Sequence, residues 1–407
     1  MTTTMRQSKP PLVPLSICII CFFLSMSILL HIEISSGQNG DVNLLSMSSD
    51  WQLRRPARLT SISTKRQEKV RQEYEQRYPP DVNRTRSFVK SLRSHNPKPV
   101  QDEEIHYDIN DCPPDPPIQY PATWRVVDVL NNWNPINESV PLQIYQGLCV
   151  FDYTRDLGKA LRYRQAEVPF ILVNAPEIWQ TAERWNRDDY LSRLIGNDGD
   201  NKVEHSTNHH FMYWKTRPHQ RTPARWKEPT EMTKLSFQDW LEKATSSNPH
   251  DWYYFRFNAI WKDTHTFIYE ELPIFKPIPS FFMVEPSKQR GINCRFGMTG
   301  VLAEAHYDSS RNWITVLKGS RRYILAHPRE CRHLELYPME HPSGRHASVD
   351  WTNFSVQEHP LFASAQVNEV LLQAGDALYL PTHWFHFIQS LDLNYQCNAR
   401  SGATDHY

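Results

Sequence analysis

The sequence predicts an α+β protein in which a β-barrel or sandwich follows a region of helices with a few strands. Three observations support this prediction. After residue 300, short apolar strands alternate with turns that contain Gly. Before residue 250, apolar residues recur mostly at helical spacing. Near residue 20, an uncharged apolar run precedes a long polar, basic stretch, which indicates a membrane helix and a stem ahead of the globular body.

The composition is that of a globular, loop-rich enzyme. The chain has 407 residues, is 40% hydrophobic and 12% aromatic, and contains 30 Pro against 13 Gly. Its formal net charge is zero, but residues 51–100 carry 13 Lys and Arg against 4 Asp and Glu. A basic segment can face an acidic membrane or a nucleic acid. Because no nucleic-acid reader motif accompanies it, we interpret this segment as a solvated spacer and expect no nucleic-acid partner.

The apolar run indicates a retained signal-anchor. It contains no charge between residues 15 and 30, and its flanks extend it to about the 20 residues that a spanning helix needs. Arg6 and Lys9 precede it and Glu33 follows it, so the N-terminus is expected in the cytoplasm. A cleaved signal peptide is the rival interpretation, with Ser35-Ser36-Gly37 as its cleavage site. The expected order is a cytoplasmic tail (1–11), a signal-anchor (12–32), a polar basic stem (33–106) and a globular domain (107–407).

Two further features agree with a lumenal or extracellular body. Asn83, Asn137 and Asn353 each begin an Asn-x-Ser/Thr glycosylation acceptor. Five cysteines follow the apolar run, a number compatible with one or two disulfides plus a free thiol. We therefore expect a single-pass type II glycoprotein whose body lies in the Golgi, the endoplasmic reticulum or outside the cell.

The elements before residue 250 are expected as follows. Residues 64–77 are compatible with a helix but have little to bury, and residues 124–130 form a short amphipathic helix. Residues 168–173 form a buried strand that Pro169 pushes towards a sheet edge. Residues 188–195 form a helix that Gly196 ends, and Ser236 caps another.

The strands after residue 300 are expected in pairs about tight turns. Residues 313–317 and 321–326 flank Lys318-Gly319-Ser320, and residues 369–373 and 377–380 flank Ala374-Gly375-Asp376. Strands at 385–390 and 394–399 complete the set.

Three residues on these strands can share a metal. His306 and Asp308 are two positions apart, so on a strand their side chains point to the same face. His386 lies on another strand-like run 80 positions later. If that strand pairs beside the first, two imidazoles and a carboxylate converge, as in the facial triad of non-haem Fe(II) oxygenases. The sequence thus predicts a metal site of His306, Asp308 and His386.

In order, the chain shows His-x-Asp, Lys-Gly-x-x-Arg, a Gly-Asp turn, Pro-x-x-Trp-Phe-His and a final strand with Asn. This pattern resembles the JmjC-type, cupin-like 2-oxoglutarate oxygenases, in particular the asparaginyl hydroxylase that acts on hypoxia-inducible factor. The likeness covers about the last 240 residues. It implies a double-stranded β-helix (jelly-roll, cupin-like) barrel with flanking N-terminal helices, and Fe(II) and 2-oxoglutarate as cofactors.

Carried over residue by residue, the resemblance implies that the triad binds iron, with no catalytic residue beyond the metal ligands. It places Asn312, Arg321 and Asn398 around 2-oxoglutarate. Two positions depart from the family, which has a lysine at Arg321 and a threonine at Ala303. Arg321 keeps the positive charge and can bind a carboxylate through two hydrogen bonds, whereas Ala303 lacks the hydroxyl.

Other candidate residues are interpreted as structural. His383 is expected at the rim of the site, and Tyr307 and Trp313 are expected to pack the barrel. A cluster in a polar loop is expected to be solvated rather than to form a second metal site: His205, His209 and His210. Three more histidines are expected to be structural residues of the long insertion between strands: His333, His341 and His346.

Three functions compete. The first is a membrane-anchored Fe(II)/2-oxoglutarate dioxygenase that hydroxylates a protein side chain. The second is a non-catalytic cupin-like binding module whose co-substrate site is degenerate at Arg321 and Ala303. The third is a type II glycosyltransferase, disfavoured because neither a nucleotide-binding α/β pattern nor a paired-acid metal motif is found. The membrane segment also disfavours a histone demethylase.

Overall fold

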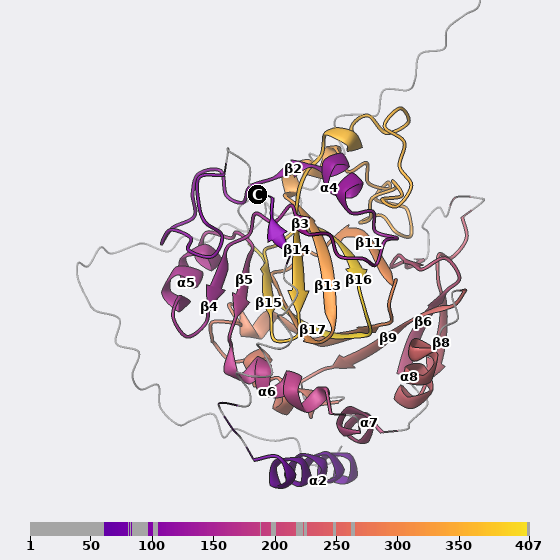
Figure 1. Cartoon of the computed structure of the whole chain (residues 1–407). Coiled ribbons are helices and arrows are strands. Elements are labelled where there is room, and N and C mark those ends of the chain that lie inside the picture. Colours follow the sequence, from indigo (N-terminus) through magenta and orange to yellow (C-terminus); the bar gives the residue numbers. More distant parts are fainter. Residues whose placement is uncertain are drawn as a thin grey trace, which may run out of the picture. The chain divides into compact units, whose positions relative to one another are not determined.

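Two packed sheets organise the part of the chain that the computed structural model describes, namely residues 61–79, 81, 83, 97–100, 105–187, 189–196, 201–216, 223, 226–246, 250–261 and 265–404 (Figure 1). All of these residues belong to one compact unit, Pro56–Thr404. The expected cytoplasmic tail and signal-anchor lie outside the described residues. Within the described part, no helix combines the length and the apolar character that crossing a membrane requires.

The larger sheet has nine strands, hydrogen-bonded in the order β4-β5-β15-β12-β17-β10-β9-β6-β8. All neighbours pair antiparallel except β4 and β5. The strands are β4 (Val150–Asp152), β5 (Phe170–Val173), β6 (Asn201–Ser206), β8 (Glu231–Leu235), β9 (Trp252–Ala259), β10 (Gln289–Gly297), β12 (Asn312–Lys318), β15 (Ala377–Leu380) and β17 (Asn394–Ser401).

The smaller sheet has six strands in the order β2-β14-β13-β16-β11-β7. They are β2 (Trp124–Arg125), β7 (His210–Phe211), β11 (Leu302–Tyr307), β13 (Ser320–Ala326), β14 (Gln366–Gln373) and β16 (Phe385–Ser390). A short parallel pair, β1 (Lys98–Pro99) and β3 (Gln143–Ile144), stands apart from both sheets.

Helices cover the outer faces. The α-helices are α2 (Ser61–Arg77), α4 (Val126–Asn132), α5 (Leu157–Gln165), α6 (Pro176–Trp185), α7 (Tyr190–Ile195), α8 (Phe237–Thr245) and α9 (Ile268–Glu271). Short 3-10 helices are η1 (Pro273–Phe275), η2 (Pro286–Lys288), η3 (Pro328–Arg332) and η4 (Phe362–Ser364). This sandwich of two sheets with surrounding helices confirms the α+β class expected from the sequence.

Strand alternation distributes the buried apolar residues of the described chain among separate clusters on the two faces of the sheets. Tyr323 and Leu325 of β13 face the interior between the sheets, with Ile314 of β12 and Leu378 of β15. The alternate residues of β13, such as Ile324, point outward and pack on α4. Because both faces of the central strands are covered, their sequences read as continuous apolar runs.

The expected hairpin at Gly319 is wrong. β12 and β13 follow each other through Gly319, yet β12 pairs with β15 and β17, whereas β13 pairs with β14 and β16. The Gly319 turn is therefore a corner that carries the chain from one sheet to the other. Gly319 has φ +63°, and a Cβ there would lie 2.1 Å from Asp392 Oδ1, so only glycine fits. The turn at Gly375 (φ +95°) makes the same crossing between β14 and β15.

Several other elements refine the expectations. Ser236 caps α8 by accepting a hydrogen bond from Asp239 N (3.0 Å), and Gly196 ends α7 at φ +82°, as expected. Two expectations are wrong in detail. Trp124–Arg125 is a strand paired with β14 rather than the first turn of the helix. β5 is not at the sheet edge, because β4 covers it.

Helix α2, assigned from the sequence to the stem, packs on the body. Val70 is buried, and the Tyr74 ring meets that of Tyr190 on α7 edge-to-face at 5.0 Å. Arg71 forms an ion pair with buried Glu271 (2.9 Å). The docking face is the one that the two apolar residues, Val70 and Tyr74, mark in the sequence, and Arg71 adds an ion pair to it.

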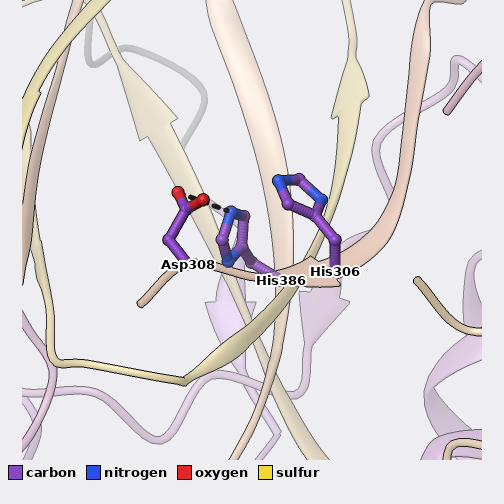
Figure 2. A group of neighbouring side chains, drawn as sticks. All are labelled: His306, Asp308 and His386. Atoms are coloured by element: carbon purple, nitrogen blue, oxygen red, sulfur yellow. Dashed lines mark ion pairs between the residues drawn. The ribbon is translucent and has the colours of Figure 1, made fainter. Parts of the chain in front are cut away.

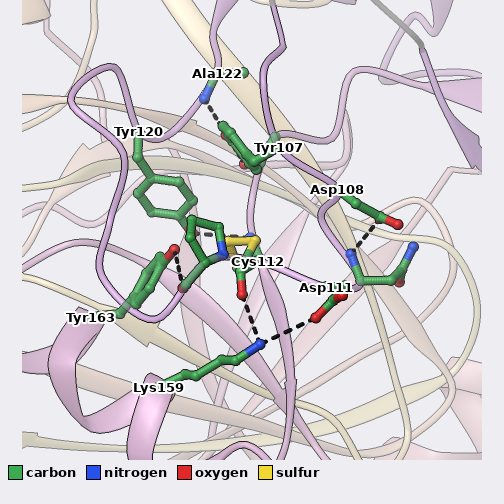
Figure 3. Close-up of a disulfide and its surroundings, with 12 residues drawn as sticks. Tyr107, Asp108, Asp111, Cys112, Tyr120, Ala122, Lys159 and Tyr163 are labelled. Carbon is green, nitrogen blue, oxygen red and sulfur yellow. Dashed lines mark hydrogen bonds and ion pairs between the residues drawn. A yellow bond between two sulfur atoms is a disulfide. The ribbon is translucent and has the colours of Figure 1, made fainter.

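Two disulfides cross-link the globular body, a number that the cysteine count allowed. Cys112 bonds Cys149, and Cys294 bonds Cys397. Figure 3 shows the first bond, beside which Lys159 Nζ donates to the Cys112 carbonyl (2.8 Å). The second joins directly opposed residues of β10 and β17. Cys331 takes part in neither bond.

Candidate metal centre

Three side chains converge on one wall of the smaller sheet. His306 lies on β11 and is the direct cross-strand partner of His386 on β16. Asp308 follows His306 by two residues and therefore projects from the same face. One donor atom from each of the three residues can be chosen so that all lie within 4.8 Å of one another. Figure 2 shows the two imidazoles and the carboxylate facing a common point. The structure thus brings together the three residues predicted from the sequence.

A β-bulge sets the direction of His306. The register of β11 against β16 shifts between Ala303 and His306, so Ala303 and His306 both line the cavity although they are three residues apart. Without that shift, strand alternation would turn one of them outward.

The backbone fixes the tautomers of both histidines. His306 Nδ1 lies 2.7 Å from the Glu304 carbonyl oxygen, and His386 Nδ1 lies 3.1 Å from the Trp384 carbonyl oxygen. A carbonyl oxygen only accepts, so each Nδ1 carries the hydrogen and each Nε2 keeps its lone pair. Such a partner behind the ring is what orients metal-binding histidines.

Electrostatics favour the protonation states that a metal requires. Burial lowers the pKa of His306 well below its usual value and also lowers that of His386, so both rings are neutral near pH 7. Burial raises the pKa of the Asp308 carboxyl, but the charges of Arg400 and Arg345 outweigh burial and hold that pKa below its usual value. Two neutral imidazoles and one carboxylate match the donor set of a facial triad, and the residues therefore fit a divalent ion.

Two arginines hold the Asp308 carboxylate. Arg345 Nη1 lies 2.9 Å from Asp308 Oδ1, and Arg400 Nη2 lies 2.6 Å from Oδ2. Neither arginine was identified from the sequence, since Arg345 comes from the insertion after β13 and Arg400 from the end of β17.

His346 is a further neighbour of the triad, although the sequence indicated only a structural residue of the insertion. It is buried, lines the cavity and stacks on His306 with ring centroids 5.1 Å apart. Burial, aided by the charge of Arg345, lowers the pKa of His346 to about 3. Two histidines expected in a polar loop lie on strands instead. His210 is on β7 and bonds buried Glu304, and His205 is on β6 with its Nε2 2.6 Å from Asp251 Oδ1.

The triad opens into a cavity of about 90 Å³ between the two sheets. Its wall carries four arginines against two acids, Glu204 and Asp308, so it is strongly basic. The arginines are Arg256, Arg295, Arg345 and Arg400. Tyr307, Trp313 and His383 do not line it. Trp313 packs instead among outer aromatic residues, and Tyr307 packs on Phe385, as expected.

Of the three residues expected to bind the co-substrate, two line the cavity and one does not. Asn312 and Asn398 line the cavity next to the triad. Arg321 is fully buried and does not line it. Its guanidinium bonds Asn394 Oδ1, and donates to Tyr254 Oη (3.1 Å), Gln396 Oε1 (2.8 Å) and the Arg295 carbonyl (3.0 Å). In this structure Arg321 therefore does not reach the cavity as expected: its side chain passes behind the wall and bonds neutral protein acceptors.

A series of amides connects this arginine to the triad. Gln396 Nε2 donates to Asn398 Oδ1 (3.4 Å), and Asn398 Nδ2 donates to Asn312 Oδ1 (2.9 Å). Asn312 Nδ2 in turn donates to Asp308 Oδ2 (3.4 Å). Every amide is thereby oriented by the one before it. Gln396 was missed from the sequence, although its position two residues before Asn398 puts it on the same strand face.

Fold and site together define a cupin-like protein with a two-histidine, one-carboxylate group in its barrel. The family model of the cupin-like domain matches residues 160–399, more than half of the chain. The chain belongs to this cupin-like domain family. The resemblance to JmjC-type, cupin-like oxygenases is thereby confirmed, and Fe(II) and 2-oxoglutarate are the cofactors on which JmjC-domain relatives depend.

Similarities to individual relatives are consistent with this family assignment. The chain is similar to lysine-specific demethylase JMJ30 of Arabidopsis thaliana, with 24% identity over 61% of this chain and 52% of that protein. It is equally similar to Jumonji C domain-containing protein 5 of Drosophila melanogaster, with 24% identity over 56% and 52%. With tRNA wybutosine-synthesizing protein 5 of Gallus gallus it shares 32% identity over 26% and 31%. The chain thus spans about half the length, or less, of these curated relatives.

Proposed function

We propose that this protein is an Fe(II)- and 2-oxoglutarate-dependent dioxygenase that hydroxylates a side chain of a protein substrate. The observation that carries the proposal is the convergence of His306, Asp308 and His386 on one point inside the barrel. When bound, Fe(II) with 2-oxoglutarate and O₂ supplies the oxidation, in which a C–H bond becomes C–OH while the keto acid becomes succinate and CO₂.

The chain's own residues would prepare the site. His306, His386 and Asp308 would hold the ion through two nitrogens and one oxygen on one side, which leaves the other side open. Asn312 and Asn398 lie beside the carboxylate with their amides already oriented. The buried walls exclude bulk water, and this limits side reactions of an oxidising centre.

Metal content and product formation test the proposal together. The full chain, loaded anaerobically with Fe(II), should bind one ion and release succinate from 2-oxoglutarate when O₂ is admitted. His306→Ala should lose both, whereas His333→Ala, which changes a histidine paired with Glu330 away from the cavity, should lose neither. A parent protein without stoichiometric iron, or succinate release that survives His306→Ala, would overturn the proposal.

One observation favours a second candidate, a non-catalytic cupin-like binding module. Arg321 keeps its donors engaged by protein acceptors and does not reach the cavity. The same experiment separates the two functions, because a binding module would release no succinate even if the triad holds a metal.

We further propose that the protein is a single-pass type II membrane glycoprotein with its body in the secretory pathway. Two disulfides support an oxidising compartment. The acceptor residues Asn83, Asn137 and Asn353 are all exposed, as a glycosylation site must be. Expressed in a eukaryotic cell, the body should be protected from protease in sealed microsomes and should lose mass on treatment with an N-glycosidase. An unprotected, unglycosylated body would contradict the proposal.

A further inference from the structure

Four basic residues form one row across the larger sheet. Lys234 on β8 is the direct cross-strand partner of Lys202 on β6, Lys202 is that of Arg256 on β9, and Arg256 is that of Arg295 on β10. Directly opposed residues point to the same face of a sheet, with their side chains close together. Three strand spacings of ~4.8 Å separate the ends of the row by about 14 Å. We call these four residues the basic row.

The basic row lies on the face of the sheet that contains the cavity. Its two arginines line the cavity, and its two lysines are exposed. The opposite face of the same strands is apolar, because Phe255 of β9 packs there on Phe237 and Trp240 of α8 (Figure 1). The basic row therefore leads from β8, the last strand of the sheet order, into the cavity of the metal centre.

The four strands supply few acids to this face. Opposed charges of the same sign destabilise a sheet, so a row of four cations costs stability. Glu204 is the acid of these strands that points the same way, and it forms an ion pair with Arg256 (2.5 Å). Arg295 donates instead to Asn258 Oδ1 (3.2 Å) and to the Cys294 carbonyl (3.0 Å). A row that is kept at such a cost suits an anionic ligand.

Tyr213 connects the basic row to the triad. Its ring lies beneath Arg256, 5.9 Å from the guanidinium carbon, and beneath Arg345, at 4.8 Å. Arg345 in turn forms an ion pair with Asp308 (2.9 Å). Tyr213 is exposed and lines the cavity, so positive charge continues from the outer lysines to the metal ligands. A ligand that reaches the triad from β8 passes over this charge.

A polypeptide fits this surface better than a uniform polyanion. The cavity of about 90 Å³ holds one side chain rather than a polymer, so the rest of a long ligand must lie outside it. An extended peptide advances ~3.3 Å per residue, and about four residues therefore cover the length of the row. A peptide can place a neutral residue beside Glu204, whereas a chain of evenly spaced phosphates or sulfates would meet its charge.

We propose that the basic row binds an acidic segment of the protein substrate, about four residues long, while a neighbouring residue of that substrate enters the cavity. The substrate class is thus a protein with Asp or Glu beside the modified residue. This inference rests on the proposed function, because it takes the triad as the place of reaction and a protein as the substrate.

The test uses two labelled peptides of equal length, one that alternates Glu with Ser and one in which every Glu is replaced by Gln. Each is titrated into the full, metal-free chain at low ionic strength, and binding is followed by fluorescence anisotropy. The acidic peptide should bind at least about 10-fold more tightly than its neutral counterpart, and added salt should weaken it. Because residues 51–100 are also basic, variants of the row decide where the peptide binds.

Lys202→Glu should weaken binding of the acidic peptide about 3- to 5-fold, and Lys202→Glu with Lys234→Glu about 10-fold or more. Lys243→Glu makes the same change of charge at an exposed lysine of α8, on the opposite face, and should leave binding within about 2-fold of the parent. Equal binding of the two peptides, or equal effects of Lys202→Glu and Lys243→Glu, would overturn the inference. A sulfated glycan or an RNA that binds in a Lys202-dependent way where the acidic peptide does not would also overturn it.

Stability provides a readout that a structural role would move in the other direction. Lys202→Glu replaces two opposed pairs of like charge by two pairs of opposite charge, so its thermal midpoint should equal or exceed that of the parent. A lowered midpoint would assign Lys202 to the fold and overturn the inference. Peptide binding is measured without iron or O₂, so its failure is distinct from a failure of succinate release, which would overturn the proposed function alone.

Discussion

The guanidinium of Arg321 and the carboxylate of Asp308 are joined by an unbroken series of hydrogen bonds through the side-chain amides of Gln396, Asn398 and Asn312. Every bond in the series runs in the same direction, from donor to acceptor, towards the triad. The buried arginine therefore determines how the amide groups beside the metal site are turned. Arg321 was expected to contact a ligand directly, but it acts through the amides that lie between it and the triad.

Breaking this series should uncouple co-substrate binding from metal binding. Gln396→Met keeps the length of the side chain but can neither accept from Arg321 nor donate to Asn398. We expect 2-oxoglutarate affinity to fall about tenfold and stability to fall by about 1–3 kcal/mol, because a charged donor is left unpaired. Mn(II) affinity should change little. Calorimetry and urea unfolding measure the three quantities, with Gln366→Met on the more exposed start of β14 as the control. An unchanged 2-oxoglutarate affinity would show that the amide orientation does not matter.

The two kinds of triad residue should differ when the metal is absent. Asp308→Ala removes the partner of both Arg345 and Arg400, so we expect the metal-free protein to lose about 1–3 kcal/mol of unfolding free energy. His386→Ala removes no ion-pair partner of comparable closeness and should cost only its packing. Both variants should abolish stoichiometric metal binding. Urea unfolding in a chelator, followed by metal analysis, distinguishes these effects, and equal unfolding losses would contradict the role assigned to the arginines.

A second buried charge pair should dominate the stability of the smaller sheet. Arg322 and Glu369 lie 2.6 Å apart on β13 and β14 and are both almost fully buried. Glu369→Leu should cost about 3–5 kcal/mol, since it strands a buried guanidinium, and adding Arg322→Met should recover part of the loss. Arg125→Met, which breaks an exposed pair with Asp128, should change stability by no more than about 0.5–1 kcal/mol. Chemical unfolding of all four proteins tests this, and a loss for Glu369→Leu as small as that for Arg125→Met would contradict it.

His327 should make the protein sensitive to mild acid. Its ring accepts a hydrogen bond from Arg329 N (3.1 Å) at the start of η3, and burial, with the charge of Arg329, lowers the pKa of His327 to about 4. The unfolded chain takes up this proton near pH 6.5, and the folded protein only near pH 4. The stabilising contribution is therefore complete above pH 6.5 and is lost as the pH falls towards 4.

His327→Asn keeps a side chain that can cap η3 but does not titrate. Between pH 7 and pH 5, the parent should lose about 1–2 kcal/mol more unfolding free energy than this variant, the lower figure allowing for solvent screening of a partly exposed ring. Parallel pH dependences of the two unfolding free energies would show that His327 does not cause the acid sensitivity.

The convergence of the three candidate metal ligands was predictable because it depends on strand alternation, which the sequence displays directly. His306 and Asp308 share a face by spacing, and His386 lies in a run with strand character. The same alternation places Gln396 on the face of Asn398, so its position beside the site was predictable from the sequence. Its role depends on which side chains reach the cavity, and packing across the two sheets decides that.

Other features could not be predicted from the sequence, because they depend on contacts between distant parts of the chain. The turns at Gly319 and Gly375 carry the local signals of hairpins, and only the wider strand order makes them corners. Arg345 and His346 reach the site from an insertion in the strand order, through contacts with residues about 40 positions away. The docking of α2 depends on Arg71 and Tyr74 meeting partners far along the chain.

Cys397 lies between Gln396 and Asn398 on β17, and its bond to Cys294 lies on the outer face of the sheet, behind the two amides. The strand that presents the amides is thus covalently fastened to its neighbour at the position between them. Maturation of the site is thereby tied to oxidative folding, and protein produced in a reducing cytosol would present its amides on an unfastened strand. For the same reason, ascorbate rather than a dithiol is the reductant to choose when iron is kept in its ferrous form.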